Sequence, residues 1–206
     1  KIMRICSCTT TAALPDIPNT ECKQSFGQIQ KLAFVRIYST GTTKNKFDST
    51  NDITKLATWQ KFTGASDGTK IVVTPFVEAP TQDGGDAITF GGGNDTLGGV
   101  EMRVGRNATN MSFALREWMQ SAIKSLKALE CEGALGVYLI NEHGQIEARK
   151  VGEEYFPLPI QSLFVGDKIH GGLQEPDSNS LQFSFSPNYS DDLVIVTPEF
   201  NAVTDL

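Results

Sequence analysis

The sequence predicts an α+β fold in which a mainly antiparallel β-sandwich or open barrel carries one amphipathic helix. Three observations lead to this prediction. One long stretch, residues 110–132, has apolar residues at helical spacing. Most of the remaining chain consists of short runs rich in β-branched and aromatic residues, which favour strands. A third stretch, residues 81–106, holds eight of the 19 glycines, which is typical of a long hairpin with a glycine-rich tip.

The predicted helix spans about residues 110–132 and ends at Gly133. Its apolar residues recur every three to four positions, so they form one stripe along the helix. Because the chain offers no second long helix, this stripe is expected to pack on one face of the sheet. The residues predicted to anchor the helix in the core are Leu115, Trp118, Met119, Ile123 and Leu126.

In chain order, the sequence predicts two strands, the hairpin, the helix and four further strands. Residues 52–60 fit either a short helix or a strand, and residues 155–160, which contain two prolines, predict an irregular connection. The runs that predict strands outside the hairpin are 30–40, 69–78, 134–140, 145–151, 181–186 and 193–197.

The chain is predicted to form one β-rich domain, residues 29–206, preceded by an extended arm, residues 1–28. The arm has little periodicity and contains Pro15 and Pro18. Ordering such a segment costs conformational entropy, so it is expected either to pack along its own domain or to reach a neighbouring subunit. Residues 81–106 are expected to project from the domain as the glycine-rich hairpin.

The length and the net charge of the chain limit the classes of function that it could have. A chain of 206 residues and 22.4 kDa fits one domain with a sizeable core. The net charge of −6 disfavours non-specific binding of nucleic acid, which needs a basic surface. The apolar runs are shorter than a membrane span requires, and the first residues lack the apolar region of a signal peptide.

The four cysteines do not form a disulfide framework. Cys6, Cys8 and Cys22 cluster near the start and Cys131 lies far away, so structural, reduced thiols are the favoured interpretation. Two alternatives remain open: a metal site built on the first three thiols, and a bridge from Cys6 or Cys8 to Cys22.

A calcium site is a further alternative. The patterns Gly84-x-Asp86-x-Ile88 and Gly93-x-Asp95-x-Leu97 lie nine residues apart and resemble the nonapeptide repeat of RTX proteins. Two imperfect copies do not build the stacked coils that complete such sites. Asp86 and Asp95 are therefore calcium candidates of low weight, and a calcium-dependent binding module is the competing function. The favoured interpretation is a hairpin with turns stabilised by Asn and Asp.

No catalytic constellation emerges from the sequence. His143 and His170 both fall in turn regions, where exposed histidines are common. Neither a phosphate-binding Walker string nor a dinucleotide-binding glycine motif that opens a helix is present. We therefore predict no catalytic residues, no cofactor and no enzymatic activity.

The order of elements, with one amphipathic helix after a long hairpin and a run of strands after it, resembles the tail tube proteins of tailed bacteriophages and their relatives in contractile injection machines. The resemblance extends from about residue 29 onward and is architectural, because this family has no short invariant motif. It implies a virion structural protein that is made in the cytoplasm of the bacterial host. It also implies self-association as stacked rings, with a hexamer expected, contacts with other virion proteins, and a lumen through which DNA passes without specific binding.

Contacts between subunits are then expected from the arm and the hairpin. The glycine-rich tip and the cysteine-bearing arm also fit another virion part, such as a capsid-decorating protein or a neck or tail ring protein. The candidate contact residues are Ile17, Asp83, Gly84, Gly85, Phe90, Gly91, Gly92, Gly93, Asn94 and Leu97.

Overall fold

The computed structural model describes Ile17 and residues 25–206. Two parts of the chain are compact and are considered separately. The first, here called the hairpin, contains residues Gly85–Asn107. The second, here called the body, contains Phe26–Gly84 and Ala108–Leu206. Most of the predicted arm, residues 1–28, lies outside the described residues, and so do Cys6, Cys8 and Cys22.

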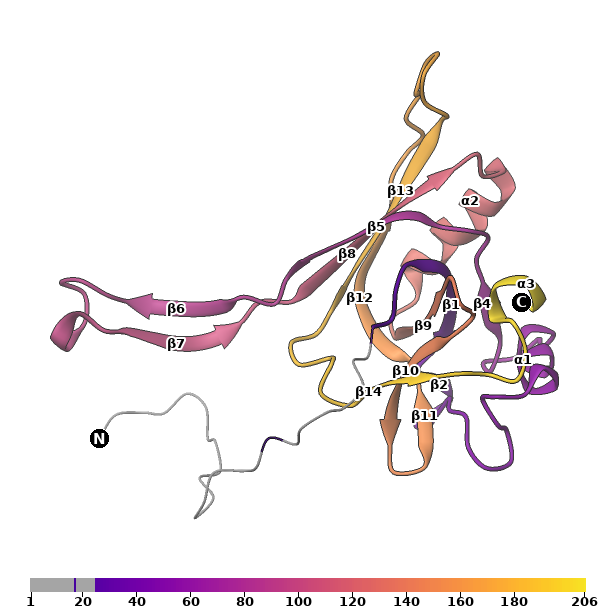
Figure 1. Ribbon diagram of the computed structural model, residues 1–206, viewed down its shortest axis with the longest axis horizontal. Coiled ribbons are helices and arrows are strands. Elements are labelled where there is room, and N and C mark those ends of the chain that lie inside the picture. Colours follow the sequence, from indigo (N-terminus) through magenta and orange to yellow (C-terminus); the bar gives the residue numbers. More distant parts are fainter. Residues whose placement is uncertain (1–16, 18–24) are drawn as a thin grey trace. The chain divides into compact units, whose positions relative to one another are not determined.

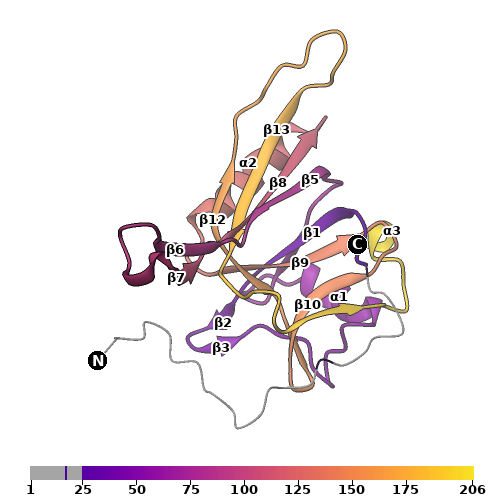
Figure 2. The ribbon, with the colours of Figure 1, turned by 60° about the vertical axis from the view of Figure 1, so that its left-hand side comes forward.

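Strand β9 (Leu135–Asn141) lies at the centre of the body, and all seven of its residues are buried. Strand β1 (Ile29–Arg36) runs antiparallel along one edge of β9. The other edge is shared, because β12 pairs with the first residues of β9 and β10 pairs with later ones. Figure 2 shows β1, β9 and β10 running side by side. The body is thus a sheet that branches at β9.

One branch continues through β12, β13, β8 and β5, and the other continues through β10 to β14 and β11, while β4 pairs with β1 (Figure 1). All of these pairings are antiparallel. A separate ribbon joins β2 (Tyr38–Thr40) to β3 (Thr43–Lys44). The bounds of the other body strands are β4 Ile71–Val73, β5 Glu78–Gly84, β8 Thr109–Arg116, β10 Ile146–Val151, β11 Glu154–Phe156, β12 Leu158–Val165, β13 Ser178–Phe185 and β14 Leu193–Val196.

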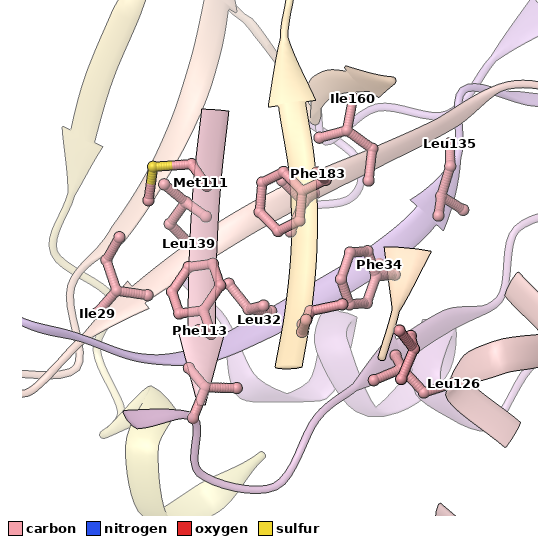
Figure 3. Packing of buried hydrophobic residues seen from close by; sticks show 14 of the residues in the cluster. Ile29, Leu32, Phe34, Met111, Phe113, Leu126, Leu135, Leu139, Ile160 and Phe183 are labelled. Carbon is pink, nitrogen blue, oxygen red and sulfur yellow. The ribbon is translucent and has the colours of Figure 1, made fainter. Parts of the chain in front are cut away.

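The body has two hydrophobic clusters, one on each face of the β1–β9 pair. In the first, side chains from β1, β8, β9, β12 and β13 meet (Figure 3). Phe34 meets Phe183 edge-on at 6.2 Å between ring centroids, and Phe183 stacks on Phe113 at 5.7 Å. In the second cluster, Trp59 packs against Phe47 at 4.9 Å and donates its indole N–H to the carbonyl of Ile53 at 2.8 Å. Aromatic packing therefore fixes both faces.

Three short α-helices cover these clusters. Helix α1 (Leu56–Thr63) carries Trp59 into the second cluster, where α3 (Ala202–Asp205) adds Ala202 and Val203. Helix α2 (Gln120–Ala128), extended by the 3₁₀ turn η2 (Leu129–Cys131), closes the first cluster. Within the described residues, no helix has the length and apolar character needed to cross a bilayer.

The hairpin part consists of β6 (Ala87–Gly91) and β7 (Glu101–Arg106), with the 3₁₀ turn η1 (Leu97–Gly99) in the connection between them. The predicted class, a mainly antiparallel α+β fold with a helix on the sheet and a long glycine-rich hairpin, is confirmed. Residues 155–160, predicted as an irregular connection, instead belong to β11 and to the first part of β12.

The predicted bounds of the helix, 110–132, are wrong. Residues 109–116 form β8, in which Met111, Phe113 and Leu115 alternate inward, and only residues 120–128 are α-helical. Strand β8 ends at Arg116, and the next residue, Glu117, turns the backbone toward α2 with a φ of +58°. The two apolar patterns overlap at Leu115, which is the last inward residue of β8 and also lies at helical spacing from Met119, Ile123 and Leu126.

The five residues predicted to anchor the helix differ in burial and in the element to which they belong. Ile123 and Leu126 are buried on α2, and Leu115 is buried but belongs to β8. Trp118 is partly buried against the first cluster. Met119 is wrong as a core anchor, because it precedes α2 in an extended conformation and its side chain is 79% exposed.

This division predicts different costs for two alanine substitutions one turn apart. Ile123→Ala removes a fully buried side chain and should lower the free energy of unfolding by about 2–4 kcal/mol. Met119→Ala should change it by less than about 0.5 kcal/mol, because that side chain is exposed. Urea unfolding of both variants measures the difference. Equal losses would show that residues 119 and 123 share one buried helical face.

Candidate subunit-contact site

The hairpin has one apolar face and one polar face. Phe90 stands opposite Met102 across the two strands, and Ile88 lies two residues from Phe90, so the three side chains point to the same side. Thr89 stands opposite Arg103 on the other side. Phe90 is 59% exposed, and Ile88 and Met102 are exposed as well. The apolar face therefore lies open to solvent.

The tip of the hairpin is built by glycines and by one threonine. Thr96 Oγ1 accepts a hydrogen bond from the Gly92 N–H at 3.0 Å and donates one to the carbonyl of Val100 at 2.8 Å. Gly91 has a φ of +89°, and a Cβ there would lie 2.1 Å from Thr96 Cγ2. Glycine is thus required at 91 for this turn, which leaves Leu97 fully exposed at its outer end.

The structure distributes the predicted contact residues over both parts of the chain. Asp83 and Gly84 belong to β5 in the body, where they stand opposite Asn110 and Thr109 of β8. Ile17 is exposed, and its neighbours in the arm lie outside the described residues. The other predicted contact residues lie on the hairpin, namely Gly85, Phe90, Gly91, Gly92, Gly93, Asn94 and Leu97. That these residues contact another subunit remains a prediction.

Sequence analysis missed part of the apolar face. Ile88 and Met102 complete the face around Phe90, and Val100 is a further exposed apolar residue at the base of the tip. The signal was present in the sequence, because 88 and 90 on one strand and 100 and 102 on the other alternate with polar residues or glycine.

The calcium candidates lie apart along the hairpin. The Asp86 carbonyl accepts a hydrogen bond from Asn107 N–H at the start of the hairpin, whereas Asp95 lies in the turn after Gly92. Across Ile17 and residues 25–206, no three His, Cys, Asp or Glu side chains gather in a way that would hold a metal ion. Calcium binding therefore gains no geometric support from the described residues.

The two histidines are exposed and each lies beside a carboxylate. His143 Nε2 is 3.6 Å from Glu142 Oε1, and His170 Nδ1 is 3.4 Å from Asp177 Oδ2. Asp177 also pairs with Lys168 at 2.6 Å and accepts from the Gly171 N–H. The contacts of Asp177 join residues of the β12–β13 loop to one another, whereas the contact between His143 and Glu142 lies in the β9–β10 turn.

One carboxyl group stands out among the titratable residues. Glu147 lies on β10 on the face opposite Ile146 and Ala148, which point into the second cluster. Its burial raises its pKa from the ordinary value of 4.5 to about 7. Tyr189, which stacks on Phe185 at 4.4 Å, lies close enough for the Glu147 charge to contribute to raising the pKa of the Tyr189 hydroxyl, which burial raises most.

No protein-family model matches this sequence, and no curated protein matches it. Among solved structures, one similar chain is part of the tail of an empty GTA particle refined with C6 symmetry. It is 13% identical, the match covers 60% of this chain and 88% of that chain, and the TM-score is 0.34. Another is part of the six-fold symmetrised baseplate of the anti-feeding prophage (AFP). It is 8% identical, the match covers 87% of this chain and 99% of that chain, and the TM-score is 0.34.

The raised pKa of Glu147 predicts a pH-dependent stability. The folded state keeps the proton to higher pH than the unfolded state, so stability is greatest below pH 4.5 and falls as the pH rises through 7. The difference between the two pKa values corresponds to at most about 3.4 kcal/mol, and partial exposure reduces the expected loss to about 1–2 kcal/mol.

Glu147→Gln should remove this loss, so the variant should be more stable than the original chain at pH 8 and close to it at pH 5. Urea unfolding at both pH values measures the effect. Glu153→Gln is the matched control on the turn that follows β10, because the Glu153 side chain is 95% exposed. A Glu147→Gln variant with the same pH dependence as the original chain would contradict the assignment.

Proposed function

We propose that this chain is a virion structural protein of a tailed phage that assembles with copies of itself into the stacked rings of a tail tube, with six copies in each ring. The observation that carries the proposal is the hairpin, whose apolar face around Phe90 is exposed. Its partners would be neighbouring copies and other virion proteins, and its location the phage tail.

The hairpin supports self-association because two strands alone are only marginally stable in water. An exposed apolar face of this kind marks an interaction surface, since leaving Phe90, Met102 and Ile88 in water forgoes the free energy of burying them. In the proposed ring, the hairpin meets a different surface of the next copy, because a head-to-tail contact whose rotation closes gives a ring, whereas a contact between two identical faces gives a dimer.

A second surface supports passage of DNA without binding. On the body, strands β5, β8, β12 and β13 present a shallow groove of about 520 Å³. Its lining is mainly polar, with Met111 and Phe183 as its apolar residues, and it carries one charged residue, the acidic Asp83, with no Lys or Arg among the described residues that line it. Phosphate groups are retained by basic side chains, so a polar surface of this composition in an acidic protein would let DNA slide past.

Another ring-forming virion component, such as a neck or tail ring protein or a capsid-decorating protein, would use the same hairpin contact. Negative-stain microscopy of the purified protein separates these assignments. A tail tube protein should give rings that stack into tubes of constant width. Single rings that never stack would favour a neck or tail ring protein.

The contact predicts that removing residues 84–99 leaves a folded monomer and abolishes assembly. A finer test is the double variant Phe90→Ser, Met102→Ser, which keeps the hairpin and removes its apolar pair. The loss of two buried side chains at each contact corresponds to about 3 kcal/mol, so assembly should need roughly a hundredfold higher concentration. Light scattering against concentration measures this.

The matched control is Thr89→Ser, Arg103→Gln, which changes the neighbouring cross-strand pair on the polar face. This control should assemble like the original chain. If large particles persist at unchanged concentration after deletion of residues 84–99, the hairpin does not hold the assembly together and the proposal fails.

A further inference from the structure

Strand β5 ends in an Asp-Gly pair. Asp83 and Gly84 are the last two residues of β5, where they stand opposite Asn110 and Thr109 of the neighbouring strand β8 (Figure 1). Both are exposed. The Gly84 N–H donates a hydrogen bond to Oδ1 of Asp83 at 2.8 Å, so the backbone nitrogen lies against the side-chain carboxyl of the preceding residue. Pairs at the end of a strand open more readily than pairs in its middle, which allows the small movement that a reaction between these two groups needs.

The backbone at the end of β5 requires glycine at position 84. Gly84 has a φ of +99°, and a Cβ there would lie 2.3 Å from the carbonyl oxygen of Ala108. A side chain on the residue after an aspartate hinders the approach of that residue's nitrogen to the carboxyl carbon of the aspartate, and glycine has no side chain. The conformation that excludes every other residue therefore also leaves the Gly84 nitrogen unshielded.

We propose that Asp83 and Gly84 form a site of spontaneous backbone modification, at which Asp83 converts to isoaspartate through a succinimide ring. The Gly84 nitrogen attacks Cγ of the protonated Asp83 carboxyl, and the amide proton and the carboxyl hydroxyl leave as water. A water molecule then opens the ring. Cleavage of the new N–Cγ bond restores aspartate, whereas cleavage of the original peptide C–N bond gives isoaspartate. One water is lost and one is gained, so the mass is unchanged and solvent water is the only co-reactant.

A second Asp-Gly pair, Asp67 and Gly68, has the same sequence in a different environment. Oδ1 of Asp67 accepts hydrogen bonds from the N–H and from the hydroxyl of Thr69. These bonds favour the ionised carboxylate and lower the pKa of Asp67, with the hydroxyl of Thr69 as the largest cause. An ionised carboxylate is a poor electrophile. The same bonds tie this carboxyl to the residue after Gly68, so the Asp67 side chain is held in an unreactive state.

Gly68 is also held by its surroundings. A Cβ at Gly68 would lie 2.1 Å from the carbonyl oxygen of Ser39, and the Gly68 carbonyl accepts a hydrogen bond from the side-chain amide of Asn45 at 2.7 Å. Closing a succinimide ring at this pair would move the backbone against these neighbours. The structure therefore distinguishes two pairs that are identical in sequence, and we expect Asp83 to react while Asp67 persists.

The modification would change the main chain at the end of β5, directly before the hairpin begins at Gly85. In isoaspartate the backbone runs through Cβ and Cγ, which adds one carbon, and the former backbone carbonyl becomes a free carboxylate. Antiparallel pairing needs regular spacing of the backbone groups on both strands. The pairs that Asp83 and Gly84 make with β8 should therefore be lost, whereas the preceding pair, Gln82 with Met111, should remain.

Peptide mapping of the full-length chain tests the proposal. The protein is incubated at about 37 °C and pH 6 and digested, and electron-transfer dissociation, which distinguishes isoaspartate from aspartate, locates the product. Isoaspartate should accumulate about tenfold faster at position 83 than at position 67, because the first pair holds its two reacting groups in contact. In concentrated urea the two positions should react at similar rates. Equal rates in the folded chain, no product at position 83, or the same ratio of rates in urea would each overturn the proposal.

Two further measurements test the chemistry. Asp83→Glu keeps the charge and should abolish the product at position 83, because the same attack would have to close a six-membered ring. Asp67→Glu is the matched control and should leave the product at position 83 unchanged, and circular dichroism checks that both variants fold. In ¹⁸O-labelled water, the isoaspartate at position 83 should carry one solvent oxygen, since water opens the ring. Isoaspartate without this label would refute the succinimide.

Discussion

The structure of the body depends on the burial of both faces of the β1–β9 pair. On β1, Leu32 and Phe34 enter one hydrophobic cluster while Ala33 and Val35 enter the other. On β9, Tyr138 and Ile140 alternate with residues of the first cluster in the same way. Because successive side chains point to opposite faces, a slip of one residue would exchange the two sets. The size difference between Ala33 and Phe34 makes such a slip costly, so this pair fixes the register of everything attached to it.

The end of β9 shows how this pair also sets the entry of the chain. Asn141 is fully buried, and its side chain accepts from the N–H groups of His143 and Gln145 and donates to the Phe26 carbonyl. One amide therefore closes the β9–β10 turn and holds the first residues of the body. A buried amide with all of these partners is stabilising, whereas one without them would be costly. The position from which the arm departs follows from this contact.

Strands with clear alternation could be predicted from the sequence, and so could the class of the fold. The residues of β1, β9, β10 and β14 stood out by composition alone. The prediction was wrong where two periods overlap, since Leu115 is both the last inward residue of β8 and the first in a helical series that continues to Ile123. The positive φ of Glu117 separates the two elements, and nothing in a single sequence marks a glutamate for that conformation.

Strand β12 was missed for another reason. Pro157 and Pro159 argue against a strand, yet Pro159 stands opposite Gly136 on β9. A Cβ at Gly136 would lie 2.8 Å from Pro157 Cβ, so the proline and the glycine fit only together. This compensation acts across 21 residues of sequence and appears only in the folded chain. The candidate site also depends on contacts between residues distant in sequence. Its glycines can be recognised in the sequence, but Phe90 and Met102 share one face only because the register of β6 and β7 places them opposite each other.

The product of a contact made by the hairpin depends on the surface that receives it. The exposed side chains of Ile88, Phe90 and Met102 could pack on the same face of a second copy, and such a contact would close the assembly at two copies. If the hairpin instead meets a different surface of the next copy, each added copy presents a new hairpin, and the assembly continues to a ring or a filament. The proposed ring therefore requires the second kind of contact, in which the apolar face is buried against a part of the neighbouring copy other than its hairpin.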